Sequence, residues 1–446
     1  MTVISNIQCS EKTSSGLFRL GVMMLCFFAA PGLLVAASLR SPACLGAPPL
    51  APVSGVVAMV SDVATLHQVI SNLQPGTTIL LEPGDYQLNQ TLYIQQDDIT
   101  IRGNSDRCDA VNLIGQGMEN ANYGQVPHGI WTNAANLKVF NLTIREVYFH
   151  PIQFDPSADA PWLYNLRLLD AGEQFIKGSS GGFGNGVNDG VVEFTIMAYT
   201  NSPPVTDHGG GGSGYTNGVD IHGGDGWLIR NNLFQNFHTP DDSDNLWNPA
   251  ILMWNGASNT VAENNVFIDV DRAIAFGLVN RTSGADHTGG IIRNNMVYSS
   301  PGLFSASRRN GSDGLIIVWD SPQTQVLHNT ILSNQNQRLS IEMRFDTTGS
   351  QVINNLNDAS IGSRNGATFT ASGNLDSATQ GMFLNPATGD LHLRGSATTV
   401  MDQVTAPVEA LFDHDGESRS GGPNADVGAD EYNPNHDVIF VEGFNG

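Results

Sequence analysis

The sequence contains only three lysines, Lys12, Lys138 and Lys177, and the third lies in the segment EQFIKGS. A histidine, His222, follows in the comparable segment GVDIHGGDG. An amine and an imidazole held side by side can move protons, one as a general base and the other as an acid or second base. A lysine acts as a base only when neutral, and a dry setting with a cationic neighbour favours that form. Lys177 and His222 are therefore the candidate catalytic pair.

Four further residues near this pair could assist it. Arginine forms bidentate pairs with carboxylates, so Arg230 and Arg272 are candidates for holding acidic groups of a substrate. Glu173 and Asp220 could bind Ca²⁺ through oxygen ligands, if a metal is present. A simpler alternative stays open for Arg230, which lies beside an asparagine turn and could only cap it.

A repeated pattern predicts the fold that positions these residues. An apolar triplet, one or two asparagines and another apolar residue recur at Asn141, Asn165, Asn232, Asn265, Asn295, Asn329 and Asn355. Asparagine tolerates the left-handed backbone that a sharp bend requires, and stacked amides can bond from copy to copy. The pattern predicts an all-β, right-handed parallel β-helix, a solenoid of stacked rungs. An antiparallel β-sandwich would not need the same asparagine in each copy.

The N-terminal part is typical of such a coil. Residues 64–73 (ATLHQVISNL) have helical periodicity and precede GTTILLEPGDYQLNQTLYI at 76–94 and ITIRG at 99–103. In these segments the chain resembles the pectin-lyase-like β-helix family. The resemblance implies an N-terminal helical cap over the open end of the stack, where strand edges would otherwise be unpaired. It extends over roughly residues 56–400 and indicates the fold more firmly than the activity.

The Lys177 and His222 segments resemble a more specific site. EQFIKGS followed one rung later by GVDIHGGDG is similar to the site of polysaccharide lyases of the chondroitinase-B and alginate-lyase type. The resemblance implies that Lys177 is the base, while His222 stands where that type has an assisting arginine. This departure leaves the division of acid and base roles open. It also implies that Ca²⁺, cations or amides neutralise the substrate carboxylate.

The sequence therefore predicts a polysaccharide lyase that cleaves a uronic-acid-containing polysaccharide by β-elimination. Three alternatives stay open. A non-catalytic carbohydrate-binding surface protein needs only exposed aromatic residues and loops. A glycoside hydrolase needs two carboxylates at a suitable separation. A uronate epimerase shares the proton abstraction but breaks no chain.

Counting back from the asparagine turns predicts a second set of strands and an outward column. The residue three positions after each inward apolar residue is expected to point outward, and the column is Asn133, Asp155, His222, Trp254, Phe276, Trp319 and Glu342. Lys177 is expected to point outward directly beneath His222, because an unpaired ammonium is costly to bury.

Some of these outward residues are candidates for holding a sugar chain. The predicted substrate-binding residues are Trp254, Phe276, Trp319, Asp155, Glu342 and His150. Exposed aromatic rings in a row suit the apolar faces of sugars. The alternative is that long loops fold over the rings and make a second apolar core, and that His150 is only a polar group of a loop; these loops are 200–218, 238–249 and 279–290.

Composition limits the partners. The formal net charge of −23 argues against a nucleic-acid partner, whose phosphates need a basic surface. An anionic polysaccharide then requires positive groups gathered locally. Lys12 and Arg19 precede an apolar run over 20–39, which predicts a signal peptide and a secreted, extracellular or periplasmic protein. If the segment is not cleaved, it is instead long enough to anchor the chain in a membrane.

The expected domain order is simple: a signal peptide or anchor (1–40), a linker (41–55), the β-helix (56–400) and a C-terminal cap and tail (401–446). Cys44 and Cys108 can form one disulfide. Acidic residues between 413 and 432 could bind Ca²⁺, but their spacing is not that of an EF-hand, so a terminal cap is favoured. We expect a monomer.

Overall fold

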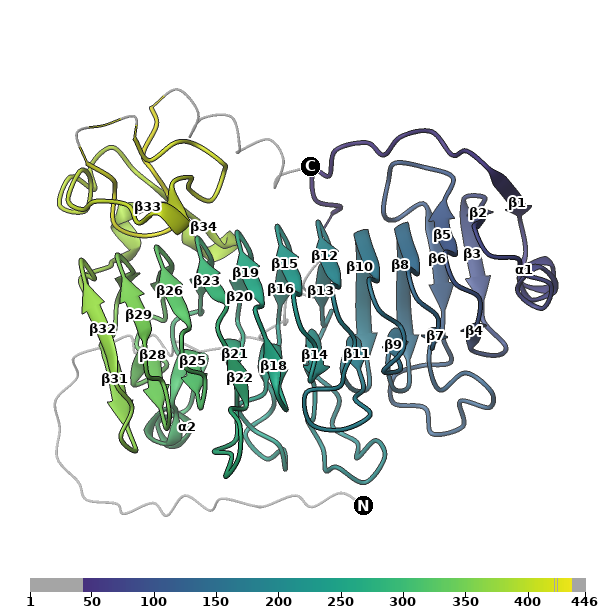
Figure 1. The fold of residues 1–446 in the computed structure, drawn as a ribbon, viewed down its shortest axis with the longest axis horizontal. Helices are drawn as coiled ribbons and strands as arrows, with labels where there is room; N and C mark the ends of the chain where they lie inside the picture. Colours follow the sequence, from purple (N-terminus) through teal and green to yellow (C-terminus); the bar gives the residue numbers. More distant parts are fainter. Residues whose placement is uncertain (1–42, 421, 423, 435–446) are drawn as a thin grey trace, which may run out of the picture. The chain divides into compact units, whose positions relative to one another are not determined.

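The structure is a computed structural model that describes residues 43–420, 422 and 424–434. The predicted signal peptide or anchor and the end of the tail lie outside these residues. Nearly all of the regular structure is parallel β-strand wound into a coil (Figure 1). The prediction of a right-handed parallel β-helix is confirmed. In the described part of the chain, none of the helices has the length and apolar character needed to cross a membrane.

Two sheets form the three faces of the coil. The larger sheet has twenty strands and supplies two faces, because the long strands β8 and β10 bend at Asn141 and Asn165 and belong to both. Its strands are β1 (Val56–Val60), β2 (Thr77–Leu81), β3 (Gly84–Gln87), β5 (Thr100–Gly103), β6 (Val111–Ile114), β8 (Lys138–Val147), β10 (Trp162–Ala171), β12 (Val191–Glu193), β13 (Ile196–Ala198), β15 (Leu228–Arg230), β16 (Leu233–Gln235), β19 (Val261–Glu263), β20 (Val266–Ile268), β23 (Ile291–Arg293), β24 (Met296–Tyr298), β26 (Gln325–Leu327), β27 (Thr330–Leu332), β29 (Ser350–Ile353), β30 (Leu356–Asn357) and β32 (Phe369–Ser372).

The third face is a ten-stranded sheet. Its strands are β4 (Leu92–Ile94), β7 (Ile130–Thr132), β9 (Ile152–Phe154), β11 (Ile176–Gly178), β14 (Val219–His222), β17 (Pro249–Trp254), β21 (Arg272–Phe276), β25 (Gly314–Trp319), β28 (Leu339–Arg344) and β31 (Ile361–Arg364). The other elements are α1 (Val63–Ile70), α2 (Ala306–Gly311), β18 (Ala257–Ser258), β22 (His287–Thr288), β33 (Phe383–Asn385), β34 (Asp390–Leu393) and the 3₁₀ turns η1 (Gln380–Met382), η2 (Pro386–Thr388) and η3 (Val408–Ala410).

The core is a stack of branched apolar residues. In the ten-stranded sheet, Ile176, Val219, Ile251, Ile274 and Ile316 lie in register on successive strands, and all are buried. Short strands suffice because each rung hydrogen-bonds to a rung on both sides. Long loops precede β14, β17 and β25, and another long loop follows β21. Loops therefore lie at both ends of the strands of this sheet.

In the asparagine repeat, two adjacent residues have two different structural roles. The first residue of each pair takes the left-handed backbone, with φ of 56° at Asn231 and 54° at Asn264. The second forms a buried ladder, in which each amide nitrogen donates to the next carbonyl oxygen at 2.8–3.0 Å. The ladder runs through Asn232, Asn265, Asn295, Asn329, Asn355 and Asn374. Both predicted uses of asparagine are confirmed.

Replacing Asn295 by alanine is expected to lower the free energy of unfolding by about 2–4 kcal/mol, because buried partners on both neighbouring rungs lose a hydrogen bond. Asn295 accepts from the Asn265 side chain and backbone and donates to Asn329. Urea unfolding followed by circular dichroism measures the change. Asn133→Ala, at an exposed asparagine, is the matched control. Equal midpoints for the two variants would contradict the ladder's contribution.

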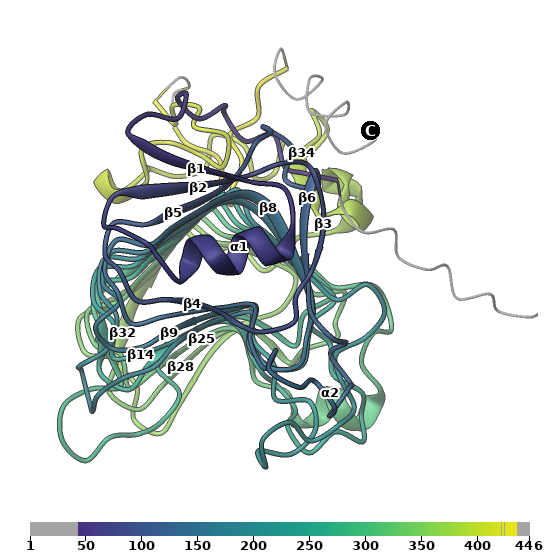
Figure 2. The same ribbon diagram turned by 90° about the vertical axis from the view of Figure 1, so that its right-hand side faces the viewer.

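Helix α1 closes the N-terminal end of the coil, as predicted (Figure 2). The Asp62 side chain caps it by accepting a hydrogen bond from the Thr65 amide at 2.8 Å. Leu66 is buried in the main core. Before the helix, the segment from residue 43 is held against the coil by a disulfide between Cys44 and Cys108.

The C-terminal segment differs from the predicted end cap. The stacked strands end with β32, and residues 373–434, named here the C-terminal module, pack against the flank of the later rungs (Figure 1). Phe383 and Leu393 bury apolar side chains such as Val266 and Met296, which point out of the twenty-stranded sheet. These outward apolar residues require a cover, and the module supplies it.

Candidate functional site

The outer surface of the ten-stranded sheet carries the predicted catalytic pair, although in a different register. Lys177 on β11 lies opposite Asp220 on β14, and His222 lies two residues further along β14, opposite Trp254 on β17. Lys177 is therefore not directly beneath His222. Its long side chain nevertheless reaches the imidazole, because side chains two positions apart on a strand share one face.

The four side chains form a compact group, named here the Lys177 cluster. Lys177 Nζ lies 2.5 Å from Asp220 Oδ2 and 2.8 Å from His222 Nε2. Asp220 Oδ1 accepts a hydrogen bond of 2.9 Å from Trp254 Nε1. The Asp220 side chain is fully buried, whereas 14% of Lys177 and 23% of His222 are exposed. The amine and the imidazole thus meet the solvent, and the carboxylate orients them from below.

The charge state of Asp220 follows from its neighbours. Burial alone would raise its pKa, but the charge of Lys177 and the hydrogen bonds from His222 and Lys177 hold the pKa of Asp220 well below its ordinary value. Asp220 is therefore ionised near neutral pH and favours a proton on the Lys177–His222 pair. Lys177 Nζ and His222 Nε2 lie 2.8 Å apart, close enough for direct proton transfer between them.

A second acidic group lies beside the cluster. Burial raises the pKa of Glu173 to about 7, and the charges of Asp207 and Asp220 add to this rise against the opposing charge of Lys177. His150 Nε2 lies 3.6 Å from Glu173 Oε2. Burial, with the charges of His128 and Lys177, holds the pKa of His150 well below its ordinary value. His150 is neutral, and Glu173 titrates near pH 7.

Binding of an anionic polymer is expected to weaken roughly tenfold as the pH rises from 6 to 8, because ionised Glu173 adds a negative charge near Lys177. The pH range follows from the raised pKa of Glu173: the side chain is neutral below about 7 and charged above it. Dissociation constants of the polymer, measured between pH 6 and pH 8, test this stepwise loss of affinity. Glu173→Gln should remove it; an unchanged pH profile in that variant would assign the step to another group.

Glu173 and Asp220 do not fit the predicted calcium site. The Asp220 oxygens are occupied by Lys177 and Trp254, and an ammonium at 2.5 Å repels a divalent cation from the same carboxylate. Ca²⁺ needs six to eight oxygen ligands.

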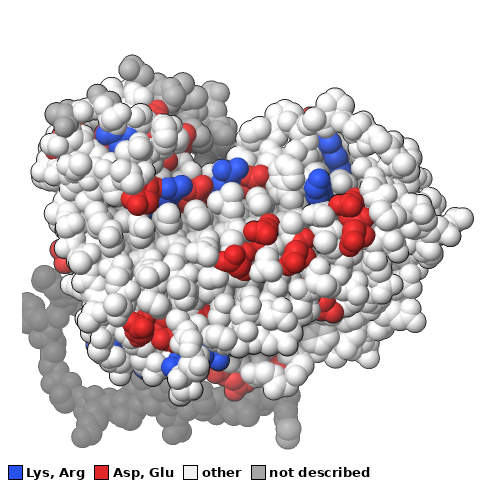
Figure 3. Space-filling model, viewed as in Figure 1, with Lys and Arg blue, Asp and Glu red and all other residues white. Residues whose placement is uncertain are grey.

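A cationic patch lies further along the same sheet. The guanidinium carbons of Arg344, Arg272 and Arg364 lie 4.6, 5.2 and 5.5 Å from the centroid of the Trp319 ring. The Trp319 Nε1 donates to Glu342 Oε2 at 2.8 Å. We name these five residues the Trp319 patch. It begins at Arg272 on β21, three strands from β11 and about 14 Å away by ordinary strand spacing. Asp313 pairs with Arg272 and Arg364, and Glu342 pairs with Arg364, so these carboxylates balance part of the positive charge. On the face drawn in Figure 3, Asp, Glu, Lys and Arg form a few separate groups on a mostly uncharged surface.

Two predicted site residues lie elsewhere. Phe276 points into the core, in register with Met253 and Val318, and its predicted outward position is wrong. Arg230 lies on β15 of the twenty-stranded sheet, where its Nε donates to Glu193 Oε2 at 2.8 Å. The structure therefore does not bring Arg230 to Lys177, and its side chain pairs with a carboxylate on the neighbouring rung instead.

The remaining predicted site residues lie near the ten-stranded sheet but differ in burial, pairing and register. Asp155 is half-buried just beyond β9. Arg272 is buried and pairs with Asp313, so its cation is partly committed. Glu342 lies in the same register column as Lys177 and Asp220 rather than that of His222.

The aromatic residues on this sheet are mostly covered. Trp319 is only 6% exposed and packs with Leu252, Ala275 and Ile317 outside the main core. The alternative of a second apolar core therefore describes Trp319. Trp254 is partly exposed, and its ring has the Arg281 guanidinium 6.0 Å from its centroid.

Three cations of this surface are absent from the sequence-based candidates: Arg281, Arg344 and Arg364. A signal was present for Arg344, because it ends RLSIEMR two residues after Glu342 and so shares its outward face. Arg364 and Arg281 carry no comparable pattern. Arg281 comes from the segment after β21, whose path cannot be read from a strand period.

Comparison with known proteins gives similarities of low identity. No family model matches the chain, and no curated protein matches it. The fold is similar to an alginate lyase from Paenibacillus sp. str. FPU-7 (15% identity, 71% of this chain and 98% of that one, TM-score 0.46). It is also similar to pectate lyase Pel9A (12%, 82% and 90%, TM-score 0.47) and to the tailspike protein of E. coli bacteriophage HK620 in complex with a pentasaccharide (12%, 79% and 60%, TM-score 0.48). At such low sequence identity, no site residue of these proteins can be assigned to a position in this chain.

Proposed function

We propose that this chain is a polysaccharide lyase that binds a uronic-acid-containing polymer on the outer surface of the ten-stranded sheet and cleaves it by β-elimination. One observation carries the proposal: a partly exposed Lys177 amine lies within hydrogen-bonding distance of both a buried, ionised Asp220 and His222. Arg281, which pairs with Asp286, and the arginines of the Trp319 patch lie over the outer surface of the same sheet.

The proton transfers that Lys177 and His222 can make suit β-elimination. Lys177 passes a proton to His222 Nε2, and the neutral amine then removes the proton alpha to the uronate carboxylate. The C–H electron pair forms the double bond, the C4–O bond breaks, and the leaving oxygen takes the proton from His222. Lys177 ends protonated and His222 neutral, so the resting state is restored. Asp220 stays ionised throughout and stabilises the positive charge, whether that charge lies on Lys177 or on His222.

The energy of the first transfer is compatible with turnover. In water an amine holds its proton about 5 kcal/mol more tightly than an imidazole. A turnover of roughly 10 per second corresponds to a barrier of about 16 kcal/mol, so the transfer uses less than half of it.

A glycoside hydrolase is the second candidate, because one observation favours it. Glu173, with a pKa of about 7, lies near Asp220, whose pKa is well below its ordinary value. Carboxyl groups with separated pKa values are typical of an acid and its ionised partner. Against this, Asp220 is fully buried and both of its oxygens already accept hydrogen bonds.

The test is incubation of the purified chain with a panel of uronic-acid polysaccharides, with and without EDTA. The lyase proposal expects ultraviolet absorbance of unsaturated uronate with at least one polymer. New reducing ends without that absorbance would favour the hydrolase. Saturable binding with neither product would overturn both enzymes in favour of a binding protein. Loss of activity in EDTA while circular dichroism shows the chain still folded would contradict a metal-independent mechanism at Lys177.

A further inference from the structure

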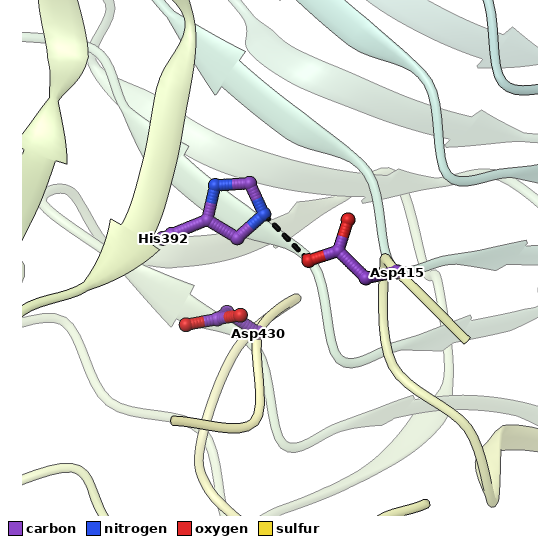
Figure 4. Close-up of side chains that lie close together, drawn as sticks. All are labelled: His392, Asp415 and Asp430. Atoms are coloured by element: carbon purple, nitrogen blue, oxygen red, sulfur yellow. Dashed lines mark hydrogen bonds and ion pairs between the residues drawn. The ribbon is translucent and has the colours of Figure 1, made fainter. Parts of the chain in front are cut away.

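The C-terminal module holds a group of metal-binding side chains far from the Lys177 cluster. His392 on β34, Asp415 and Asp430 come from three separate segments, and their ligand atoms lie within 4.8 Å of one another (Figure 4). His392 Nε2 lies 2.8 Å from Asp415 Oδ2. No other group of this kind occurs among the described residues. The proposed lyase mechanism uses none of the three.

The imidazole is also oriented from its other side. His392 Nδ1 lies 2.7 Å from Asp390 Oδ1, on the same strand. A carboxylate that accepts from one ring nitrogen fixes the tautomer and turns the other nitrogen toward a ligand, as in carboxylate–histidine–zinc arrangements. Asp390 is therefore the orienting residue, and Nε2 points toward Asp415, with Asp430 lying close by (Figure 4).

The charge balance of the module favours a cation. Between residues 373 and 434 the chain has ten carboxylates and two arginines. His392 and Asp430 are buried, and Asp415 is exposed as a residue although only 18% of its side chain is, so solvent reaches the group at Asp415. An exposed ligand provides the entry path that a metal site needs.

We propose that His392 Nε2, Asp415 and Asp430 form a Zn²⁺ site, with water completing the coordination. One nitrogen and two carboxylate oxygens suit zinc better than calcium, which prefers oxygen ligands alone. The ion replaces the direct contact between His392 and Asp415. It links β34 to the segments that contain Asp415 and Asp430, and so ties together the module that covers the flank of the coil.

Zinc titration into the untagged, EDTA-treated full-length chain tests the site by calorimetry. We expect one Zn²⁺ per chain, at least tenfold weaker binding in His392→Ala and in Asp415→Asn, and about 10–100-fold weaker binding in Asp390→Asn. Asp415 is the least buried of the three, so its variant keeps the test valid if His392→Ala does not fold. Asp402→Asn, a carboxylate of the same module outside the group, is the matched control and should bind normally.

Three outcomes would overturn the zinc site: no zinc binding at one equivalent, unchanged binding in both ligand variants, or preference for Ca²⁺ over Zn²⁺. The test is independent of the proposed lyase activity. Lys177→Ala should bind zinc as the wild-type chain does, and a failure of the lyase proposal would leave the zinc titration unaffected.

Discussion

Replacing Lys177 by alanine is expected to reduce the formation of unsaturated uronate by about 1,000-fold, within the range for losing a general base. The structure adds a sharper variant. Lys177→Arg keeps the positive charge beside Asp220 but cannot be deprotonated in the neutral pH range. It should therefore bind the polymer with similar affinity and remain inactive.

Initial rates and dissociation constants for both variants measure these effects. Lys138→Ala is the matched control, because Lys138 is the other lysine of the described residues and lies on β8 of the other sheet. If Lys177→Arg retained more than about a tenth of wild-type activity, Lys177 would act through its charge rather than as a base.

Replacing Asp220 by asparagine is expected to lower both activity, by about 100-fold, and stability, by about 3 kcal/mol at pH 7. The variant leaves the Lys177 ammonium without its buried counter-charge and weakens the hydrogen bonds that orient His222 and Trp254. Circular dichroism with urea unfolding and initial rates measure the two effects separately.

The stability effect of Asp220 has a defined pH range. Its pKa is lowered in the folded chain, so its contribution is present above the ordinary carboxylate pKa of about 4 and is lost as the pH falls toward the folded value. The difference between wild type and Asp220→Asn should therefore shrink below about pH 4. Asp155→Asn, at a half-buried carboxylate beyond β9, is the control and should show no such convergence. A difference that persists unchanged at low pH would contradict the ionised state of Asp220.

The asparagine repeat made the fold predictable, because the same buried ladder and bend recur in rung after rung. Lys177 was also placed outward correctly, since burial of an unpaired ammonium is costly. The failure at Phe276 has a physical cause. The strand RAIAF is buried on both sides, so it has no alternation of polar and apolar residues, and a slip of one residue reverses every side chain.

Contacts between distant segments could not be predicted. Asp220 contacts Lys177 because the two residues are paired in the strand register. A shift of two positions along β14, as in the prediction from sequence, places His222 opposite Lys177 instead. Arg281 reaches this surface from a loop, and Arg344 and Arg364 reach it from the last two strands of the sheet. The zinc ligands come from three segments whose sequence spacing resembles no metal motif, and only the packing of the module brings them together.

Cleavage in water enriched in heavy oxygen tests the central claim most directly. β-Elimination breaks the C4–O bond without adding water, whereas hydrolysis adds one oxygen atom from water. Mass spectrometry of the early products, taken before label exchanges at the reducing end, should therefore show unsaturated non-reducing ends and no heavy oxygen introduced by cleavage. Saturated products carrying one heavy oxygen per cleaved bond would contradict β-elimination at Lys177.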